Sequence, residues 1–352
     1  EPLDENRMSR ATLEAMWDAV TRHRHRLLPY FERKAQLMGS ERLAWYDVHV
    51  PAIRSEARMT YDEAATFILE QFARFSPDMA ALARRAFEER WIEAEDRPNK
   101  RAGGFCTSFP VSRQSRIFMT FSGAPSNVGT LAHELGHAYH QHVIDDLPPL
   151  AQNYPMNLAE TASTFAERVV TDAAIHHTTD PTTRLALIEQ QVLDCVSFFM
   201  NIHARFLFET AFYEARRSGP LSVEELNRLM VDAQRRAYHD ALAEYHPHFW
   251  ASKLHFYITE APFYNFPYTF GFLFSTGIYA RALAEGAGFA RRYADLLRDT
   301  GRMTTEELAA RHLGVDLTRP DFWEEAVETA LAPVERFLEL SAGGAPAGNG
   351  DH

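Results

Sequence analysis

Cysteine is scarce in this 352-residue chain, which contains only Cys106 and Cys195. Two cysteines cannot form a disulfide framework, so the fold must depend on a hydrophobic core, which a chain of this length can bury. The sequence has no run of 18 apolar residues, and it starts with a polar, charged segment. We therefore expect neither a membrane-spanning helix nor a signal peptide, and we predict a cytoplasmic protein without a membrane partner.

Basic residues are also few relative to acidic ones. The chain has 36 Lys and Arg against 48 Asp and Glu, which gives a net charge of −12. Binding to a nucleic-acid backbone needs a basic surface, so this balance argues against nucleic acid and leaves peptides or small molecules as partners. Histidine, in contrast, occurs 16 times, which suggests metal or proton chemistry. The composition indicates no oligomeric state.

Apolar residues recur with helical spacing along most of the chain. The segments with this spacing are 9–38, 60–75, 77–94, 125–144, 157–177, 183–217, 222–245, 268–286, 288–299, 304–312 and 321–340. Residues 102–123 differ, because their alternation and glycines predict two short strands and a turn. With no internal repeat and no long linker, the sequence predicts a mainly α fold with a small sheet, in one domain over 1–340 with a flexible tail at 341–352.

One motif within these helices carries chemistry. Residues 133–140 read HELGHAYH. His133 and His137 lie four residues apart, so on a helix both imidazoles point the same way and can bind one Zn²⁺. Glu134 can then act as general base toward the attacking water, which fits peptide hydrolysis. The alternative is a chance motif on an ordinary helix, but that would leave four buried ring nitrogens in need of partners.

A catalytic zinc needs a third protein ligand and one open position. An extended HExxHxxGxxH site is excluded because His140 and Val143 occupy its glycine and histidine positions. Glu160 can face back from the next helix and is the expected third ligand, the alternative being a capping or solvated glutamate. Glu167, on the same face, is either an outer partner of a ligating histidine or one half of a surface salt bridge. Cys106 is not expected to be a nucleophile.

The two segments LAHELGHAYH and AETASTFAE resemble the zinc oligopeptidases of the thimet oligopeptidase and oligoendopeptidase F group, the second more closely. The resemblance continues in KRAGGFCTSF upstream and KLHFYITEAPFYNFPYTFGFLFSTG downstream, so it covers residues 97–280. It implies a zincin-like catalytic lobe with the sheet next to the HExxH helix. It also implies one zinc per chain on His133, His137 and Glu160, a general base at Glu134, and cleavage inside short unstructured oligopeptides.

The downstream segment supplies candidate contacts to the scissile bond. The resemblance implies that a histidine and one or more tyrosines act there, and a hydroxyl or imidazole can stabilise a developing oxyanion. We select His255 and Tyr264 first, with Tyr268 as a further candidate. The alternative for the tyrosines is a place in the core lining, since aromatic residues crowd this segment. Gly103 and Gly104 could admit a substrate backbone, or could form an ordinary turn.

The domain is expected to divide into a helical lead-in (1–96), a core with the zinc site and substrate contacts (97–280), and C-terminal helices (281–340). Members of the resembled group have a longer helical region ahead of the motif, much of which is absent here. A second possibility is therefore a zinc-binding helical fragment or interaction module with weak activity that needs a partner lobe. An aminopeptidase is disfavoured because the chain has no GxMEN motif.

Overall fold

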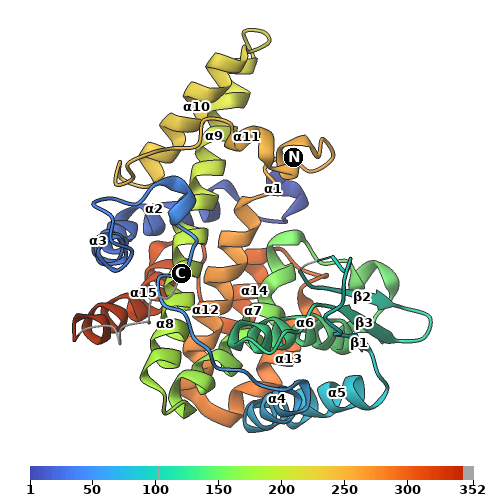
Figure 1. Ribbon diagram of the computed structural model, residues 1–352. Helices are drawn as coiled ribbons and strands as arrows, with labels where there is room; N and C mark the ends of the chain where they lie inside the picture. Colours follow the sequence, from blue (N-terminus) through green and yellow to red (C-terminus); the bar gives the residue numbers. More distant parts are fainter. Residues whose placement is uncertain (102, 344–352) are drawn as a thin grey trace.

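Two long helices that pack against each other form the centre of the molecule. The computed structural model describes residues 1–101 and 103–343, and in it α6 (Pro125–Ile144) lies along α7 (Met156–His177) (Figure 1). Gly129 faces the side chains of Glu167 and Thr171, whereas Gly136 faces Ala162. The order of these contacts makes the two helices antiparallel, as the short connection between them predicts.

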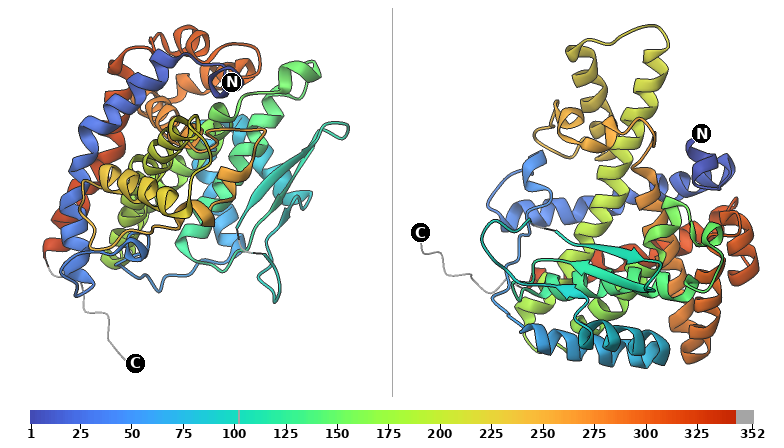
Figure 2. Two further views of the ribbon diagram at one scale, coloured as in Figure 1. Left: turned by 90° about the horizontal axis from the view of Figure 1, so that it is seen from above. Right: turned by 90° about the vertical axis from the view of Figure 1, so that its right-hand side faces the viewer.

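The other helices surround this pair. They are α1 (Pro2–Glu5), α2 (Arg10–His23), α3 (Leu28–Leu37), α4 (Tyr61–Phe75), α5 (Pro77–Glu88), α8 (Pro181–Val196), α9 (Ile202–Arg216), α10 (Val223–Ala237), α11 (Phe249–Ser252), α12 (Phe266–Glu285), α13 (Phe289–Asp299), α14 (Thr305–Leu313) and α15 (Pro320–Ala342). Short 3-10 turns cover Arg24–Leu27, Trp45–Asp47, Pro149–Gln152, Leu254–Tyr257 and Gly286–Gly288. Helices α9 and α10 project from the body as a hairpin (Figures 1 and 2).

Helix boundaries follow the local signals in most places. Thr60 caps α4 through a reciprocal capping box with Glu63, and prolines open α5, α6 and α8. Two predicted helices are too long. The segment 77–94 leaves its helix at Glu88, and the segment 222–245 leaves its helix at Ala237, just before two residues with positive φ, His239 and Asp240. The predicted tail boundary at 341 falls inside α15, and residues 344–352 lie outside the described part of the chain.

A small sheet lies beside α6 (Figure 2). Its strands are β1 (Ile92–Glu93), β2 (Phe105–Phe109) and β3 (Gln114–Phe118), in the order β1-β3-β2. The β2–β3 hairpin is antiparallel and confirms the prediction for 102–123, whereas β1 pairs parallel to β3 and was not predicted. The sheet therefore presents β2 as its edge strand next to the HExxH helix.

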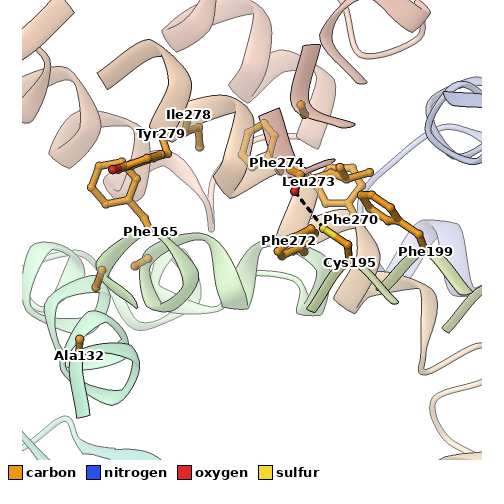
Figure 3. Close-up of a cluster of buried hydrophobic side chains, with 14 of the residues drawn as sticks. Ala132, Phe165, Cys195, Phe199, Phe270, Phe272, Leu273, Phe274, Ile278 and Tyr279 are labelled. Atoms are coloured by element: carbon orange, nitrogen blue, oxygen red, sulfur yellow. Dashed lines mark hydrogen bonds between the residues drawn. The ribbon is translucent and has the colours of Figure 1, made fainter. Parts of the chain in front are cut away.

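Helix α12 is the aromatic centre of the core. Most of its side chains between Phe266 and Tyr279 are buried, and it packs on α7 and α15 (Figure 3). Phe165 of α7 meets Tyr279 of α12 edge to face, and the Cys195 thiol donates a hydrogen bond to the carbonyl of Ala330 (3.1 Å). Close to the metal-binding motif, Gly271 lets α12 approach Cβ of Glu160, because a Cβ at 271 would lie 3.0 Å from it.

The segment from Pro181 to Arg216 is one continuous helix that includes a single π turn at Ser197–Asn201. By length and composition this helix could cross a membrane, although it contains no run of 18 apolar residues. However, 72% of its most apolar window is buried inside the protein. This burial is typical of a core helix, and the helix accordingly packs on α15, α7 and α10 through its two halves.

The first residues of the chain contact the beginning of α7. The side-chain oxygen of Asn6 accepts a hydrogen bond from the backbone N–H of Asn157 (3.0 Å). The guanidinium of Arg7 donates to the carbonyls of Asn153 (2.8 Å) and Gly301 (2.7 Å). Asn6 therefore satisfies one of the backbone donors that the first turn of a helix leaves without an internal partner.

Gly136 sets how closely α6 and α7 approach. A Cβ at this position would lie 2.5 Å from the carbonyl oxygen of Ala162, closer than real contacts allow. We therefore expect Gly136→Ala to force the helices apart and lower the free energy of unfolding by about 1–3 kcal/mol, measured by denaturant unfolding. Gly288→Ala is the matched control, because a Cβ there meets nothing within 4 Å. Equal stability of the two variants would contradict the prediction.

Candidate metal centre

The structure brings His133, His137 and Glu160 together. Both histidines point from one face of α6, and Glu160 reaches them from α7. One ligand atom from each residue lies within 4.8 Å of the other two. Glu160 Oε2 is 3.2 Å from His133 Nε2 and 3.5 Å from His137 Nε2. Among the described residues, no other set of three His, Cys, Asp or Glu side chains has this property.

These distances fit a tetrahedral metal ion. Zinc bonds of 2.0–2.2 Å place neighbouring ligand atoms about 3.4 Å apart, close to both separations from Glu160. Two imidazoles and one carboxylate are a zinc donor set that leaves a fourth position for water or substrate. The residues present therefore fit the zinc ion that the sequence predicts.

An outer contact orients the first histidine. The Nδ1–H group of His133 donates a hydrogen bond to Glu167 Oε2 (2.9 Å). The other ring nitrogen, Nε2, faces Glu160. Burial alone would lower the pKa of His133, but hydrogen bonds to Glu160 and Glu167 outweigh it and raise the pKa. Glu167 is thus an outer partner of His133, one of the two interpretations that the sequence left open. Carboxylates in this position commonly fix the ring orientation of metal-bound histidines.

The protonation states of the other two groups suit a bound cation. Burial opposes ionisation of Glu160, but the hydrogen bond from His133 and the neighbouring imidazoles of His137 and His133 lower its pKa to about 2. Burial, together with the charge of His133, lowers the pKa of His137 to about 4. The cluster therefore presents an ionised carboxylate and a neutral imidazole, which are the protonation states that metal ligands require.

Glu134 lies in the same cavity but outside the three-residue cluster. A cavity of about 380 Å³ is lined by His133, Glu134, His137 and Glu160, together with Tyr154 and residues of β2. Glu134 is 5% exposed. Its Oε1 lies beside Gly104, and its Oε2 has no hydrogen-bond partner among the described residues. Burial raises its pKa to about 7, opposed by His133 and reinforced by Glu160 and Glu167.

Gly104, just ahead of β2, makes room for the carboxylate of Glu134. A Cβ on Gly104 would lie 2.9 Å from Glu134 Oε1, so a glycine is needed for the carboxylate to approach the strand. The prediction that Gly103 and Gly104 admit a substrate backbone stays a prediction. Cys106, the next cavity residue along β2, has a thiol whose pKa burial and Glu134 raise to about 12, and such a protonated thiol is a poor nucleophile.

His255, Tyr264 and Tyr268 form one aromatic cluster. The ring of His255 lies 4.5 Å from that of Tyr264 and 5.9 Å from that of Tyr268. Tyr268 also lines a larger cavity of about 700 Å³, to which His133 and Glu160 contribute. Burial, then Tyr264, then Glu160 raise the pKa of Tyr268. The structure therefore connects the three predicted contact residues to the metal centre through Tyr268.

The sequence matches a known family over most of its length. The profile described as Peptidase family M3 covers residues 5–329. The chain belongs to peptidase family M3. This match confirms the resemblance to zinc oligopeptidases that the motifs indicate.

Curated relatives of the M3 chain are longer than it is. It is 26% identical to an oligoendopeptidase F homolog of Lactococcus lactis subsp. lactis, over 93% of this chain and 55% of the relative. It is 27% identical to group B oligopeptidase PepB of Streptococcus agalactiae, over 96% of this chain and 56% of the relative. The M3 chain thus spans about half the length of the curated relatives it matches.

Solved structures share the fold of the M3 chain. A putative peptidase from Chlamydophila abortus superposes with a TM-score of 0.82 at 20% identity, covering 96% of this chain and 57% of that one. Oligoendopeptidase-F from Enterococcus faecium superposes with a TM-score of 0.70 at 20% identity, covering 97% and 55%. These likenesses confirm the predicted mainly helical fold with a small sheet.

One wall of the larger cavity in the M3 chain is an extended segment, residues 51–58. The buried carboxylate of Glu189 holds it, accepting hydrogen bonds from the backbone N–H groups of Ala52 and Ile53 (both 2.8 Å). Tyr30 of α3 donates to the same carboxylate (3.0 Å). This wall has no regular secondary structure, so its two hydrogen bonds to Glu189 help to fix its position, and the hydrogen bond from Tyr30 holds Glu189 itself.

Sequence reasoning missed Tyr154, which lines the smaller cavity of the M3 chain. Its ring stacks on that of His140 at 4.1 Å, and His140 Nε2 lies 2.9 Å from the hydroxyl of Thr300. His140 therefore supports the ring of Tyr154, and its Nε2 is engaged by Thr300. A single tyrosine in a loop belongs to no periodic pattern, so the only sequence signal for Tyr154 is its position six residues before Glu160.

The contact between His133 and Glu167 can be tested in the M3 chain. We expect Glu167→Gln to weaken zinc binding by about 10–100-fold, because the ring of His133 loses the carboxylate that orients it and increases its basicity. Competition with a chromogenic chelator measures the affinity. Glu88→Gln is the control, since it removes an exposed glutamate far from the site in sequence. An unchanged affinity would contradict the assigned role of Glu167.

Proposed function

We propose that this M3 chain is a zinc-dependent endopeptidase that hydrolyses internal bonds of short, unstructured oligopeptides. The observation that supports it most directly is the grouping of His133, His137 and Glu160 within 4.8 Å, with Glu134 in the same cavity. The names of its relatives, oligoendopeptidase F and oligopeptidase, agree with it. The expected cytoplasmic location stays part of the proposal.

In this proposal His133, His137 and Glu160 hold one zinc ion per chain. When bound, zinc would supply Lewis-acid chemistry, polarising the scissile carbonyl and making water more acidic. Glu134 accepts a proton from the attacking water and passes it to the leaving amine nitrogen. The unpartnered oxygen of this buried carboxylate supports that role, because it is free to receive the proton.

The aromatic cluster is proposed to contact the peptide at the scissile bond. Tyr268 borders the larger cavity with His133 and Glu160, His255 stacks on it, and Tyr264 packs against His255 at a tilt. Their polar atoms can hydrogen-bond to backbone groups of a substrate and to a developing oxyanion. A direct comparison of Tyr264→Phe with Tyr268→Phe decides which tyrosine contacts the oxyanion.

Two cavities that adjoin the proposed ligands support a peptide substrate. They have volumes of about 700 and 380 Å³ and share His133 and Glu160. A chain that crosses the metal centre can occupy both, with one cavity on each side of the cleaved bond. Volumes of this size hold a few side chains rather than a folded domain.

The half-length match supports a second candidate function. A chain that spans about half of its relatives could be a metal-binding part that gains full activity only with a partner lobe. Both candidates place zinc on the same residues, and they differ in whether the chain cleaves peptides alone.

The deciding experiment measures metal content and cleavage of a quenched fluorescent oligopeptide library by the purified chain. We expect about one zinc per chain, internal cleavage, loss of cleavage with a chelator, and recovery on adding zinc. Bound zinc without cleavage would support the partner-lobe candidate. Absence of zinc binding would refute both.

A further inference from the structure

A buried hydrogen-bond chain from α9 reaches His255. The guanidinium of Arg205 donates through Nη1 to Asn265 Oδ1 (2.9 Å), and Nδ1 of His255 lies 2.9 Å from the same oxygen. Asn265 is 1% exposed. This amide therefore has no access to water, and its partners determine its orientation.

The orientation of the Asn265 amide follows from the chemistry of its neighbours. Arg205 has only donors, so the amide atom facing it must be the oxygen. Arg205 therefore fixes the orientation of the amide, with Oδ1 toward the guanidinium. The Nδ2 atom has no hydrogen-bond partner among the described residues.

This orientation dictates where the proton of His255 lies. Asn265 Oδ1 can only accept, so Nδ1 of His255 must donate. A neutral imidazole has one proton, and if Nδ1 holds it, Nε2 has a free lone pair. None of the hydrogen bonds among the described residues engages Nε2 of His255. The ring also stacks on Tyr268 and packs against Tyr264 at a tilt, which helps to fix it.

We infer that Arg205 and Asn265 are positioning residues that lock neutral His255 as its Nδ1–H tautomer, so that Nε2 accepts a hydrogen bond from a backbone N–H of the peptide substrate. The substrate part of this inference rests on the proposed peptidase function. It assigns His255 to recognition of a peptide N–H, whereas donation to an oxyanion would require a second proton on the ring. A substrate with no N–H at that position loses the contact.

The tautomer can be measured without any activity. In the intact protein labelled with ¹⁵N-histidine, His255→Gln identifies the His255 signals, and long-range ¹⁵N–¹H correlations distinguish protonated from unprotonated ring nitrogens. We expect a protonated Nδ1 and an unprotonated Nε2 for neutral His255, and a shift of the proton toward Nε2 in Asn265→Ala. Asn227→Ala is the control, because its amide contacts Trp250 and His248 instead. A proton on Nε2 in the unmodified protein would overturn the inference.

The substrate contact is tested with peptides in which one backbone N–H at a time, outside the cleaved bond, is replaced by an ester oxygen. We expect one replacement to lower kcat/KM by about three- to tenfold in the unmodified protein and to have no effect in His255→Phe. Discrimination that persists in His255→Phe would overturn the substrate contact. If no peptide is cleaved, the proposed function fails, while the ¹⁵N spectrum still decides the tautomer.

Discussion

Replacing Glu134 with glutamine should lower kcat/KM for a cleavable oligopeptide by about a hundred- to ten-thousandfold, the usual contribution of a positioned general base. Glutamine keeps the size of the side chain but cannot accept a proton. Zinc content should stay at one per chain, because Glu134 is outside the ligand cluster. Steady-state cleavage with metal analysis on the same samples provides the measurement.

The same variant makes a prediction about stability. Burial raises the pKa of Glu134 to about 7, and one of its oxygens has no partner, so a neutral amide removes the cost of a buried charge. Thermal unfolding of Glu134→Gln should therefore begin no lower than that of the parent protein. Activity lost together with a large fall in Tm would instead indicate a folding defect and count against the general-base assignment.

Glu160→Gln should release zinc and abolish cleavage with it. The substitution removes the only anionic member of the three-residue cluster, and loss of an outer partner alone costs about 10–100-fold in affinity, so we expect a loss of more than about a hundredfold. Chelator competition measures it. Ser163→Ala provides the comparison, since it removes only the hydrogen bond that Ser163 donates to Glu160 Oε2 (2.7 Å) and should cost less affinity than Glu160→Gln. A Glu160→Gln protein that retains zinc at parental affinity would refute this ligand.

The sequence predicted the grouping of His133, His137 and Glu160 because its signals are local. The two histidines lie one helical turn apart, and Glu160 lies early in the next helix, so the periodicity of α6 and α7 is enough to bring them together. The prolines and caps that start the helices are equally local. For the same reason β1 escaped prediction, since two residues paired with a distant strand carry no pattern of their own.

The contacts around the centre depend on pairs far apart in the chain. Arg205 and Asn265 are 60 residues apart, and His140 meets Thr300 across 160 residues. Neither pair has a spacing that a single sequence can display. The end of α10 was not predicted for a different reason: the positive φ values of His239 and Asp240, just after the helix, occur without the glycine that usually marks such a turn.

The hydrogen bond between Asn6 and Asn157 joins residues 151 positions apart, so Asn6 caps the helix that carries Glu160. Asn6 is synthesised long before α7, so this hydrogen bond can form only after both segments exist. In the folded protein, transient release of residues 1–7 would uncover the first turn of α7, one turn before Glu160. Deuterium exchange should therefore detect release of residues 1–7 and exposure of Asn157 together, as one cooperative opening.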